Sequence, residues 1–424
     1  MLVIGGGPAG STIAALLAAR GERVVLVEKD RHPRFHIGES LLPMNVPLFE
    51  ELGVSEEIAR IGMPKYGVEF ISPWHNKSVS LDFADAWDKR FPYSFEVRRS
   101  EFDHILLKNA SAKGASVVEG CRVNSVEFPD EGGVVAMGTG EGGEALRWQA
   151  KFLVDATGRD TLLANKLAMK QRNRRHNTAA VFGHFTGARR LPGKAAGNIT
   201  IFWFDHGWFW FIPLADETTS IGAVCRPEFM KSRKSDVTTF LHSLIAMCPA
   251  LVDRLAGATM TGPATATGNY SYQAERMTGR NFIMVGDAFS FVDPVFSTGV
   301  FLAMKGAFLG ADAVTACLHR PREAKWALRR FESEVRQAIA RISWYIYRVN
   351  RPAMRDLLMT ERNVFRIQEA MLSLLSGDMS HESPIRFRLL LFKGIFYTKS
   401  FLLAQAARFS RLVGKPLLAG AEGD

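Results

Sequence analysis

The sequence predicts an α/β fold in which a parallel sheet is accompanied by an antiparallel sheet and a helical C-terminal part. Three observations lead to this prediction. The chain opens with a short apolar strand, a glycine-rich turn and an apolar helical run. Short segments rich in Phe, Trp and Ile recur between about residues 179 and 224, which is typical of antiparallel strands. From Pro321 onward the pattern is helical and basic.

The opening turn carries a nucleotide-binding pattern. Gly5, Gly7 and Gly10 stand between the strand and the helix in the order G-x-G-x-x-G. Such glycines permit a tight turn, close approach of the backbone to a pyrophosphate, and close packing of helix on strand. Glu28 ends a second strand 18 residues after Gly10, where a carboxylate can accept hydrogen bonds from a ribose diol. The pattern predicts a Rossmann-like dinucleotide site, and a purely structural βαβ unit is the alternative.

Further segments are placed by their periodicity. Short alternating segments predict a hairpin-rich insertion between about residues 123 and 152. A buried strand at residues 281–285 leads into Gly286 and Asp287, and loops at the carboxyl ends of parallel strands hold ligand in such folds. The apolar patterns that predict single helices cover residues 43–61, 99–112, 235–255 and 300–318.

Composition limits the class of protein. The 424 residues carry a net charge of +10, which suits anionic ligands or an acidic carrier protein, and no nucleic-acid-binding motif accompanies it. The four cysteines lie far apart with no C-x-x-C pair, which favours reduced thiols over disulfides or a metal site. The apolar start lacks the basic segment of a signal peptide, and no apolar run is expected to be long enough and free enough of charge to span a bilayer. We therefore expect a cytoplasmic protein.

Four segments together resemble flavin-binding proteins of the monooxygenase type. They are the opening fingerprint, Arg99 before Phe102-Asp103, residues 155–158, and Gly286-Asp287. The resemblance implies a bound FAD, with Arg99 on the phosphate side and Asp287 on a ribityl hydroxyl. It also implies that the long helix after Gly299 directs its positive end at the flavin ring. The residues expected to contact FAD are Gly5, Gly7, Ala9, Gly10, Ser11, Glu28, Lys29, Ser40, Arg99, Asp287 and Gly299.

Three further motifs narrow the resemblance to the flavin-dependent halogenases. Residues 208–213 match that family's W-x-W-x-I-P pattern, and residues 65–67 resemble its K-x-G segment. Residues 35–40 look like its glycine-acid-serine turn. The resemblance implies that reduced FAD and O₂ oxidise chloride or bromide to hypohalous acid, and that Lys65 delivers this oxidant to an aromatic ring. An apolar partition of Trp208, Trp210 and Pro213 would keep the organic substrate away from the flavin.

The turn Ser297-Thr298-Gly299 precedes the long helix, and its backbone N–H groups are candidates for a halide site. A helix cap is the alternative interpretation, and one turn can serve both purposes. The tryptophan-type halogenases carry a glutamate just before this Ser-Thr-Gly, which helps to remove the ring proton. Phe296 stands there instead, which favours a phenol or pyrrole over an indole. No metal is expected.

The predicted division of the chain has three parts. Residues 1–63, 98–170 and 270–328 are assigned to the FAD-binding domain, residues 64–97 and 171–269 to a substrate-side sheet subdomain, and residues 329–424 to a helical subdomain. Without a second dinucleotide fingerprint, we expect a separate reductase to supply reduced flavin. The expected partners are this reductase, a small aromatic substrate and, through the basic C-terminal helices, an acyl or peptidyl carrier protein.

Two other functions compete with halogenation. A flavin-dependent hydroxylase or a reductase of the geranylgeranyl type would share the scaffold and the flavin motifs, but Lys65 and the Trp208–Trp210 pair argue against both. A non-catalytic flavin-binding or carrier-docking protein is the third possibility. The basic C-terminal helices can also be explained as a solvated face.

Overall fold

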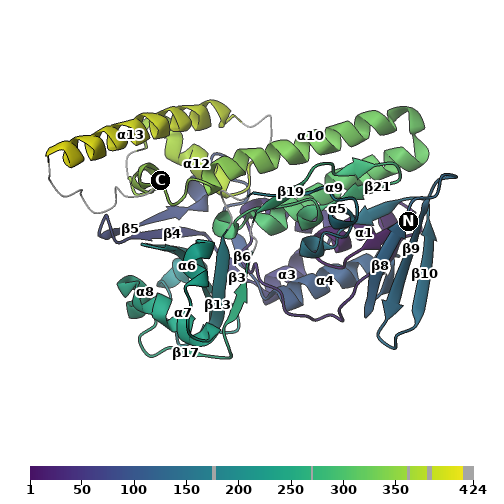
Figure 1. Ribbon diagram of the computed structural model, residues 1–424, viewed down its shortest axis with the longest axis horizontal. Coiled ribbons are helices and arrows are strands. Elements are labelled where there is room, and N and C mark those ends of the chain that lie inside the picture. The colour runs from purple at the N-terminus through teal and green to yellow at the C-terminus, as the bar shows by residue number, and fades with distance from the viewer. Residues whose placement is uncertain (174–177, 269–270, 361–362, 380–383, 414–424) are drawn as a thin grey trace. The chain divides into compact units, whose positions relative to one another are not determined.

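The computed structural model describes residues 1–173, 178–268, 271–360, 363–379 and 384–413 (Figure 1). The chain divides into two compact units. The first consists of Met1–Gly62, Val97–His176 and Tyr270–Ala340. The second consists of Met63–Glu96, Asn177–Asn269 and Arg341–Asp424.

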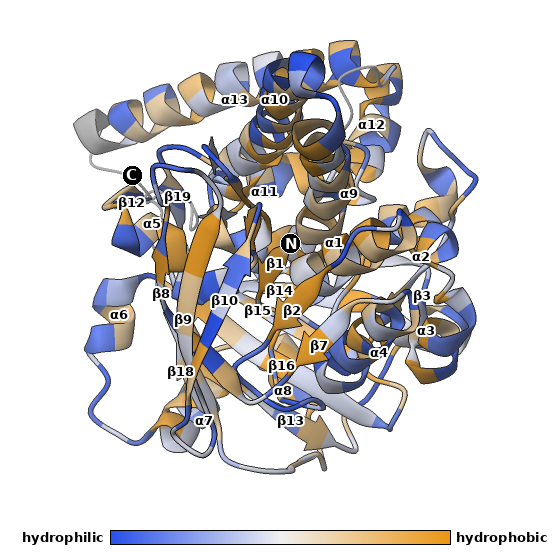
Figure 2. Ribbon diagram, turned by 90° about the vertical axis from the view of Figure 1, so that its right-hand side faces the viewer, coloured by the Kyte–Doolittle hydropathy of each residue, from blue (hydrophilic) through white to orange (hydrophobic). Residues whose placement is uncertain are grey.

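The first unit is built on a six-stranded sheet with the order β20-β21-β11-β1-β2-β7. All neighbouring strands are parallel except β20 and β21, and β1 lies between β11 and β2. Figure 2 shows β1 and β2 as strongly hydrophobic, as expected of a parallel sheet covered on both faces. In chain order the strands are β1 (Leu2–Ile4), β2 (Val25–Val27), β7 (Ser116–Val118), β11 (Leu153–Asp155), β20 (Thr278–Gly279) and β21 (Phe282–Met284).

Helix α1 packs against both α4 and α9 in this unit. Two small sheets complete it, one with the order β10-β9-β8 and one with the order β12-β19-β22. The remaining bounds are α1 (Pro8–Ala19), α2 (Val46–Leu52), α3 (Ser55–Ile61), α4 (Arg99–Ala112), β8 (Cys121–Glu127), β9 (Val134–Gly140), β10 (Ala145–Ala150), α5 (Leu162–Lys166), β12 (Lys170–Arg172), β19 (Tyr272–Ala274), β22 (Ser290–Phe291) and α9 (Thr298–His319).

Helix α9 corrects one prediction from the sequence. Its 22 residues reach a mean hydropathy of 1.5, so that by length and composition it could cross a membrane. The expectation that no apolar run is long enough was therefore wrong. The structure buries 67% of its most apolar window, and α9 packs along α1, so it is a core helix of the first unit.

The second unit contains an eight-stranded sheet, in which β4 and β14 are parallel and the other pairs are antiparallel. The predicted antiparallel sheet therefore has one parallel pair. A separate ribbon joins β3 (Met63–Lys65) to β6 (Ser94–Glu96). The strands of the large sheet are β4 (Gly67–Ser72), β5 (Lys77–Asp82), β13 (Ala179–Thr186), β14 (Ile199–Phe204), β15 (Gly207–Pro213), β16 (Thr218–Cys225), β17 (Thr259–Met260) and β18 (Thr265–Thr267).

One face of this sheet is covered by helices α7 (Val237–Ala246) and α8 (Pro249–Arg254), and α7 lies beside β13 in Figure 1. The apolar cluster beneath them includes Phe209 and Phe211 of β15, together with Leu241 and Leu251 of the two helices. Because side chains alternate along a strand, the even-numbered residues of β15 point to the opposite face.

Within the described residues, the C-terminal part of the second unit is mainly helical, as predicted. Helix α13 packs against α11 and α12. Helix α10 runs without a break through the predicted boundary at residue 329, and the predicted helical part extends to residues 414–424, outside the described residues. The chain divides into two compact units, and residues 341–424 belong to the same unit as the large sheet. The three-part division therefore stays a prediction. The remaining helices are α6 (Pro227–Lys231), α10 (Pro321–Ile346), α11 (Pro352–Leu358), α12 (Ile367–Leu375) and α13 (Arg386–Val413).

Candidate functional site

The three fingerprint glycines, Gly5, Gly7 and Gly10, differ in why the structure has a glycine at that position. Gly5 has a φ of +104°, and a Cβ there would overlap the carbonyl oxygen of Ala156. A Cβ on Gly10 would overlap the carbonyl oxygen of Gly5, so helix and strand could not approach as they do. A Cβ on Gly7 would meet only Nη2 of Arg34, at an ordinary 3.6 Å. The fold itself therefore requires Gly5 and Gly10, whereas Gly7 leaves space in front of the first turn of α1.

The start of α1 fits an anionic group. Gly7 is its N-cap, with no side-chain cap among the described residues, and the first turn contains no acidic residue. The backbone N–H groups at such an end have no intrahelical acceptor and carry partial positive charge. Ala9 and Ser11 are buried in this turn, and the hydroxyl of Ser11 donates to the carbonyl of Gly6 at 2.8 Å. This geometry suits a pyrophosphate.

Glu28 lies at the end of β2 and is 4% exposed. Its carboxylate accepts hydrogen bonds from the backbone N–H groups of Gly6 and Asp30, which ties the second strand to the glycine turn. A carboxylate has more than two acceptor positions, so the capacity to accept from a ribose diol remains. The neighbouring Lys29 forms an ion pair with Asp160 at 2.6 Å.

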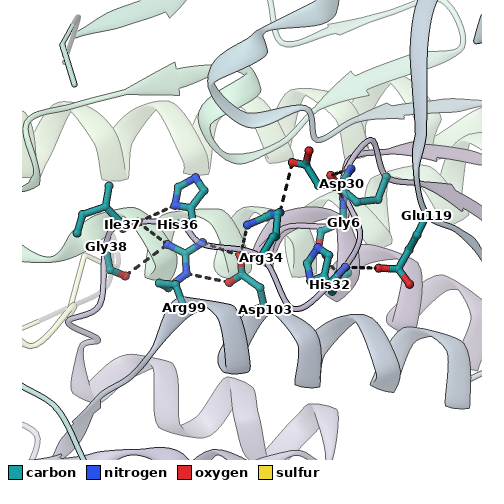
Figure 3. A network of polar contacts seen from close by, with 12 residues as sticks. Gly6, Asp30, His32, Arg34, His36, Ile37, Gly38, Arg99, Asp103 and Glu119 are labelled. Carbon is teal, nitrogen blue, oxygen red and sulfur yellow. Dashed lines mark hydrogen bonds and ion pairs between the residues drawn. The ribbon is translucent and has the colours of Figure 1, made fainter. Parts of the chain in front are cut away.

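Arg99 is the centre of a buried polar network at the start of α4 (Figure 3). Its guanidinium donates to both carboxylate oxygens of Asp103, at 2.8 and 3.0 Å, and to the carbonyls of Ile37 and Gly38. Burial alone would raise the pKa of Asp103, but the guanidiniums of Arg99 and Arg34 hold it below its ordinary value. Arg99 thus fixes the loop that precedes Ser40, and Asp103, which the sequence analysis named only as part of the motif, is its buried partner.

Motifs far apart in the sequence meet in the first unit. The hydroxyl of Ser297 donates to that of Ser40 at 2.9 Å, across 257 residues of chain. Gly286 has a φ of +60°, and a Cβ there would press on Cβ atoms of Ala9 and Ala303. The glycine turn, the Gly286-Asp287 turn and the start of α9 therefore converge at one place, as a single bound dinucleotide requires.

Asp287 lies in the turn after β21, and its backbone carbonyl accepts a hydrogen bond from the Tyr272 hydroxyl at 2.9 Å. Burial raises the pKa of its carboxyl to about 6, although the guanidiniums of Arg159 and Arg99 oppose the shift. A carboxyl group with this pKa is half protonated in mildly acidic solution. It can then donate to a hydroxyl as well as accept from one.

This shift predicts a pH dependence of stability. The unfolded chain binds fewer protons at Asp287 than the folded chain between about pH 4 and pH 6, so the folded state loses stability as the pH rises through 6. We expect the free energy of unfolding of FAD-free protein to fall by up to about 3 kcal/mol relative to Asp287→Asn over this range. Urea unfolding of both proteins at pH 4, 5, 6 and 7 measures it, and parallel curves would contradict it.

The turn at the start of α9 contains one fully buried residue, Thr298, between the half-buried Ser297 and Gly299. Ser297 adopts a left-handed conformation with φ +56°, and no described side chain caps the helix. Thr298 is 1% exposed, and its hydroxyl has no hydrogen-bond partner among the described residues. A Cβ on Gly299 would meet no atom within 4 Å, so open space adjoins the turn. A buried hydroxyl and free N–H groups beside open space suit a small anion.

Lys65 ends β3 and is only 1% exposed. Its ammonium lies 3.6 Å from Oε1 of the buried Glu96 and 5.6 Å from the ring centre of Phe83. Burial lowers the pKa of Lys65, and the charge of Glu96 opposes that shift. The ordinary alternative for any lysine, a solvated surface position, does not apply here.

Trp208 and Trp210 lie on the face of β15 opposite the α7–α8 core. Their ring centres are 6.1 Å apart, and the Trp210 indole N–H donates to the Ser220 hydroxyl at 3.1 Å. A Cβ on Gly222 would overlap the Trp210 ring, so this glycine makes room for the indole. Both indoles are buried, as is Pro213 at the end of the strand.

The predicted residues divide between the two units. The first unit brings together the fingerprint, Glu28, Ser40, Arg99, Asp287 and the turn at residues 297–299. The second unit holds Lys65, Trp208, Trp210 and Pro213. Sequence reasoning passed over Ser94 and Glu96, which pair with the Lys65 strand. The only sign of them in the sequence is that two polar residues stand in a short segment that is otherwise typical of a buried strand.

The comparison with known protein families shows which family the chain belongs to. A model of the tryptophan halogenase family matches residues 1–85 and 75–351. The chain belongs to that family. The family name describes the group of proteins, and the substrate of this member is a separate question.

Individual halogenases resemble the chain along much of its length. A tryptophan 2-halogenase of Chondromyces crocatus is 38% identical over 328 residues, covering 75% of this chain and 61% of that protein. A 1H-pyrrole-2-carbonyl-[peptidyl-carrier protein] chlorinase of Pseudomonas fluorescens is 29% identical over 381 residues, covering 82% and 84%. The structure of the myxobacterial chondrochloren halogenase CndH, a FAD-dependent enzyme, superposes with a TM-score of 0.77 and 33% identity, covering 91% of each chain. The chain spans 61–66% of the length of three curated relatives it matches.

Membership of this family confirms the predicted cofactor, because flavin-dependent halogenases use FAD. The residues present fit it. The space in front of Gly7 and the start of α1, where no described side chain caps the helix, would suit a pyrophosphate, and the buried acid Glu28 would suit a ribose. Asp287 and the uncapped start of α9 lie where these motifs converge.

Proposed function

We propose that the chain catalyses halogenation of an electron-rich aromatic compound, a phenol or a pyrrole, free or bound to a carrier protein. In the balanced reaction, FADH₂, O₂, a halide ion, a proton and the arene give FAD, the aryl halide and two molecules of water. When bound, reduced FAD supplies the electrons that let O₂ oxidise halide to hypohalous acid. The residues of the chain bind the halide, hold the oxidant and exclude water.

The burial of Lys65 carries this proposal. A hypohalous acid is small and reactive, so an enzyme must keep it from water until it meets the ring. An amine that is 1% exposed can hold such a molecule, either by donating a hydrogen bond to it or by forming a haloamine. The tryptophan pair supports the same proposal, because two buried indoles on one sheet face form an apolar partition.

Halide binding is assigned to the turn of Ser297, Thr298 and Gly299. The Thr298 hydroxyl supports this assignment, because it has no partner among the described residues and a buried donor without an acceptor costs about 1–3 kcal/mol unless a ligand satisfies it. The uncapped start of α9 adds favourable interaction with an anion. We also propose that Ser40 and Gly299, which lie at or beside this turn, contact the bound FAD.

The halide assignment predicts the effect of Thr298→Val. This variant keeps the shape of the side chain but removes its hydroxyl, so we expect the KM for bromide to rise about tenfold, as loss of one charge-assisted hydrogen bond implies. FAD affinity should be unchanged. Steady-state assays at varied bromide, with flavin fluorescence for FAD, measure both quantities. An unchanged bromide KM would remove Thr298 from the halide site.

The substrate class follows from Phe296. This buried phenylalanine occupies the position at which the tryptophan-type enzymes carry a proton-accepting glutamate, and a phenyl ring accepts no proton. A phenol or pyrrole loses its ring proton readily after attack, whereas an indole has greater need of a base. The pyrrole chlorinase among the relatives supports the same class, including a carrier-bound substrate. In this proposal the chain is cytoplasmic and a separate reductase supplies its reduced flavin.

A substrate panel tests the proposed function. The protein is supplied with reduced FAD, O₂, bromide and a set of phenols, pyrroles and indoles, each free or as a carrier-protein thioester. Isotope-resolved mass spectrometry detects bromine in the products. Bromination of phenols or pyrroles supports the proposal, and bromination of indoles alone would refute the substrate class. Hydroxylated products, or NADPH oxidation without bromination, would favour the hydroxylase or reductase alternatives.

A further inference from the structure

The ribbon of β3 and β6 places three polar side chains on one face. Lys65 lies directly opposite Ser94, and Glu96 lies opposite Met63. In an antiparallel pair, residues two positions apart on one strand share a face, so Glu96 is the diagonal neighbour of Lys65. The 3.6 Å between the ammonium and Oε1 of Glu96 agrees with that diagonal placement.

All three side chains are withdrawn from solvent. Lys65 is 1% exposed, and Ser94 and Glu96 are 0% exposed. Burying an ammonium or a carboxylate costs several kcal/mol, and an opposite charge in contact repays part of this cost. The separation of 3.6 Å exceeds the 2.7–2.9 Å of a strong ammonium–carboxylate hydrogen bond. The ammonium and the carboxylate are nevertheless close enough for strong electrostatic coupling.

Ser94 gives independent evidence for a polar guest. Its hydroxyl is fully buried and has no hydrogen-bond partner in the described part of the chain. Such a group is costly in a folded protein unless a water or ligand satisfies it. Since Ser94 faces Lys65 across the ribbon, a small oxygen-containing molecule between them would bond to both.

We propose that Glu96 is the positioning residue for Lys65, holding its amine beside the Ser94 hydroxyl and setting the pH range in which it handles the oxidant. This inference rests on the proposed function. Glu96 acts through Lys65, and Ser94 with Lys65 contacts the hypohalous acid.

Glu96 dominates the charge environment of Lys65. Its negative charge stabilises the ammonium form and raises the pKa of Lys65 against the lowering caused by burial. The charged residue on the other segment packed against β3, Lys194 of residues 193–197, directs its ammonium to the ring of Tyr66 and to Asp82. Removing the Glu96 charge therefore lowers the pKa of Lys65 further.

The test is the pH profile of bromination by the FAD-loaded Glu96→Gln enzyme. We expect one limb to move to lower pH by about 1–3 units, as loss of an adjacent opposite charge implies, whichever protonation form of Lys65 is active. The share of oxidant that escapes and is caught by a trapping reagent in solution should rise. Glu96→Asp keeps the charge and is expected to restore most of both effects. Superimposable profiles, or a shift to higher pH, would overturn the inference.

A matched control separates positioning from stability. Glu69 is also a buried glutamate of the second unit, where it pairs with Arg254 at 2.7 Å and accepts from Thr200 at 2.9 Å. Glu69→Gln should lower thermal stability without moving the pH profile. Lys65→Met distinguishes the proposed delivery role of Lys65 from the positioning role of Glu96. If that variant still halogenates, the proposed delivery role fails, whereas if it is inactive and Glu96→Gln keeps the wild-type profile, only the role of Glu96 fails.

Discussion

Replacing Lys65 by methionine is expected to lower the rate of halogenation by about 10²–10⁴-fold, the usual contribution of a positioned proton donor or acceptor. FAD binding and O₂ consumption should stay near the wild-type level, because the fingerprint, Arg99 and Asp287 belong to the first unit. The oxidant would then escape instead of reaching the ring. Product mass spectrometry, an oxygen electrode and a trapping reagent for hypohalous acid measure the three quantities.

The single substitution also leaves Glu96 as a buried charge that has lost this partner. Breaking a buried ion pair in this way costs about 3–5 kcal/mol, so Lys65→Met by itself risks confusing instability with loss of chemistry. The double variant Lys65→Met with Glu96→Gln replaces both charges and should recover most of the lost stability while remaining unable to halogenate. Recovered halogenation in the double variant would contradict the delivery role.

An exposed lysine provides the control for Lys65→Met. Lys194 lies three residues before Gly197, which packs on the β3 strand, but 60% of its side chain is exposed. Lys194→Met should leave both the halogenation rate and the trapped oxidant unchanged. A comparable loss in this variant would show that positive charge near the strand, and not the buried amine, supports the reaction.

The sequence was most informative where local geometry restricts the residue. Gly5 and Gly10 could be predicted because a side chain at either position would overlap backbone atoms, whatever the rest of the fold does. The order of strand, glycine turn, helix and second strand around them predicted the parallel sheet, because a crossover helix joins parallel strands. Family resemblance then extended the prediction to Lys65 and to the turn at residues 297–299, and the structure shows that Lys65 and Thr298 are buried.

Predictions that depend on tertiary contacts were less complete. Residues 43–61 were expected to form one helix, but Gly53 adopts a φ of +76° and separates α2 from α3. Residues 235–255 are likewise divided, at Pro249, into α7 and α8. Helical periodicity continues across such breaks, because the apolar face must still reach the core on both sides.

Glu96 was missed for a different physical reason. It is 31 positions from Lys65, and nothing in either local sequence specifies that β3 pairs with β6 in the register that sets them on one face. A shift of one residue would turn Glu96 away from the lysine. The alternation that separates Trp208 and Trp210 from Phe209 and Phe211 was readable, but which face α7 and α8 would cover was not.

The second large effect concerns the glycine turn. Gly10→Ala is expected to destabilise the FAD-free protein by about 3 kcal/mol or more, because the new Cβ overlaps the Gly5 carbonyl and α1 must move away from β1. For a unit of this size such a loss corresponds to a fall in Tm of roughly 6–12 °C. Differential scanning fluorimetry of FAD-free protein measures it.

Gly7→Ala separates the ligand's requirement from that of the fold. Its Cβ would meet only Nη2 of Arg34 at 3.6 Å, so the FAD-free variant should keep its stability to within about 1 kcal/mol. The same methyl group occupies the space in front of α1 that a pyrophosphate needs, and the Kd for FAD should rise at least about tenfold, which corresponds to about 1.4 kcal/mol. Flavin fluorescence titration measures the Kd. Wild-type affinity in Gly7→Ala would mean that the phosphates do not approach this turn, because a glycine that neither the fold nor the ligand requires has no physical reason to be there.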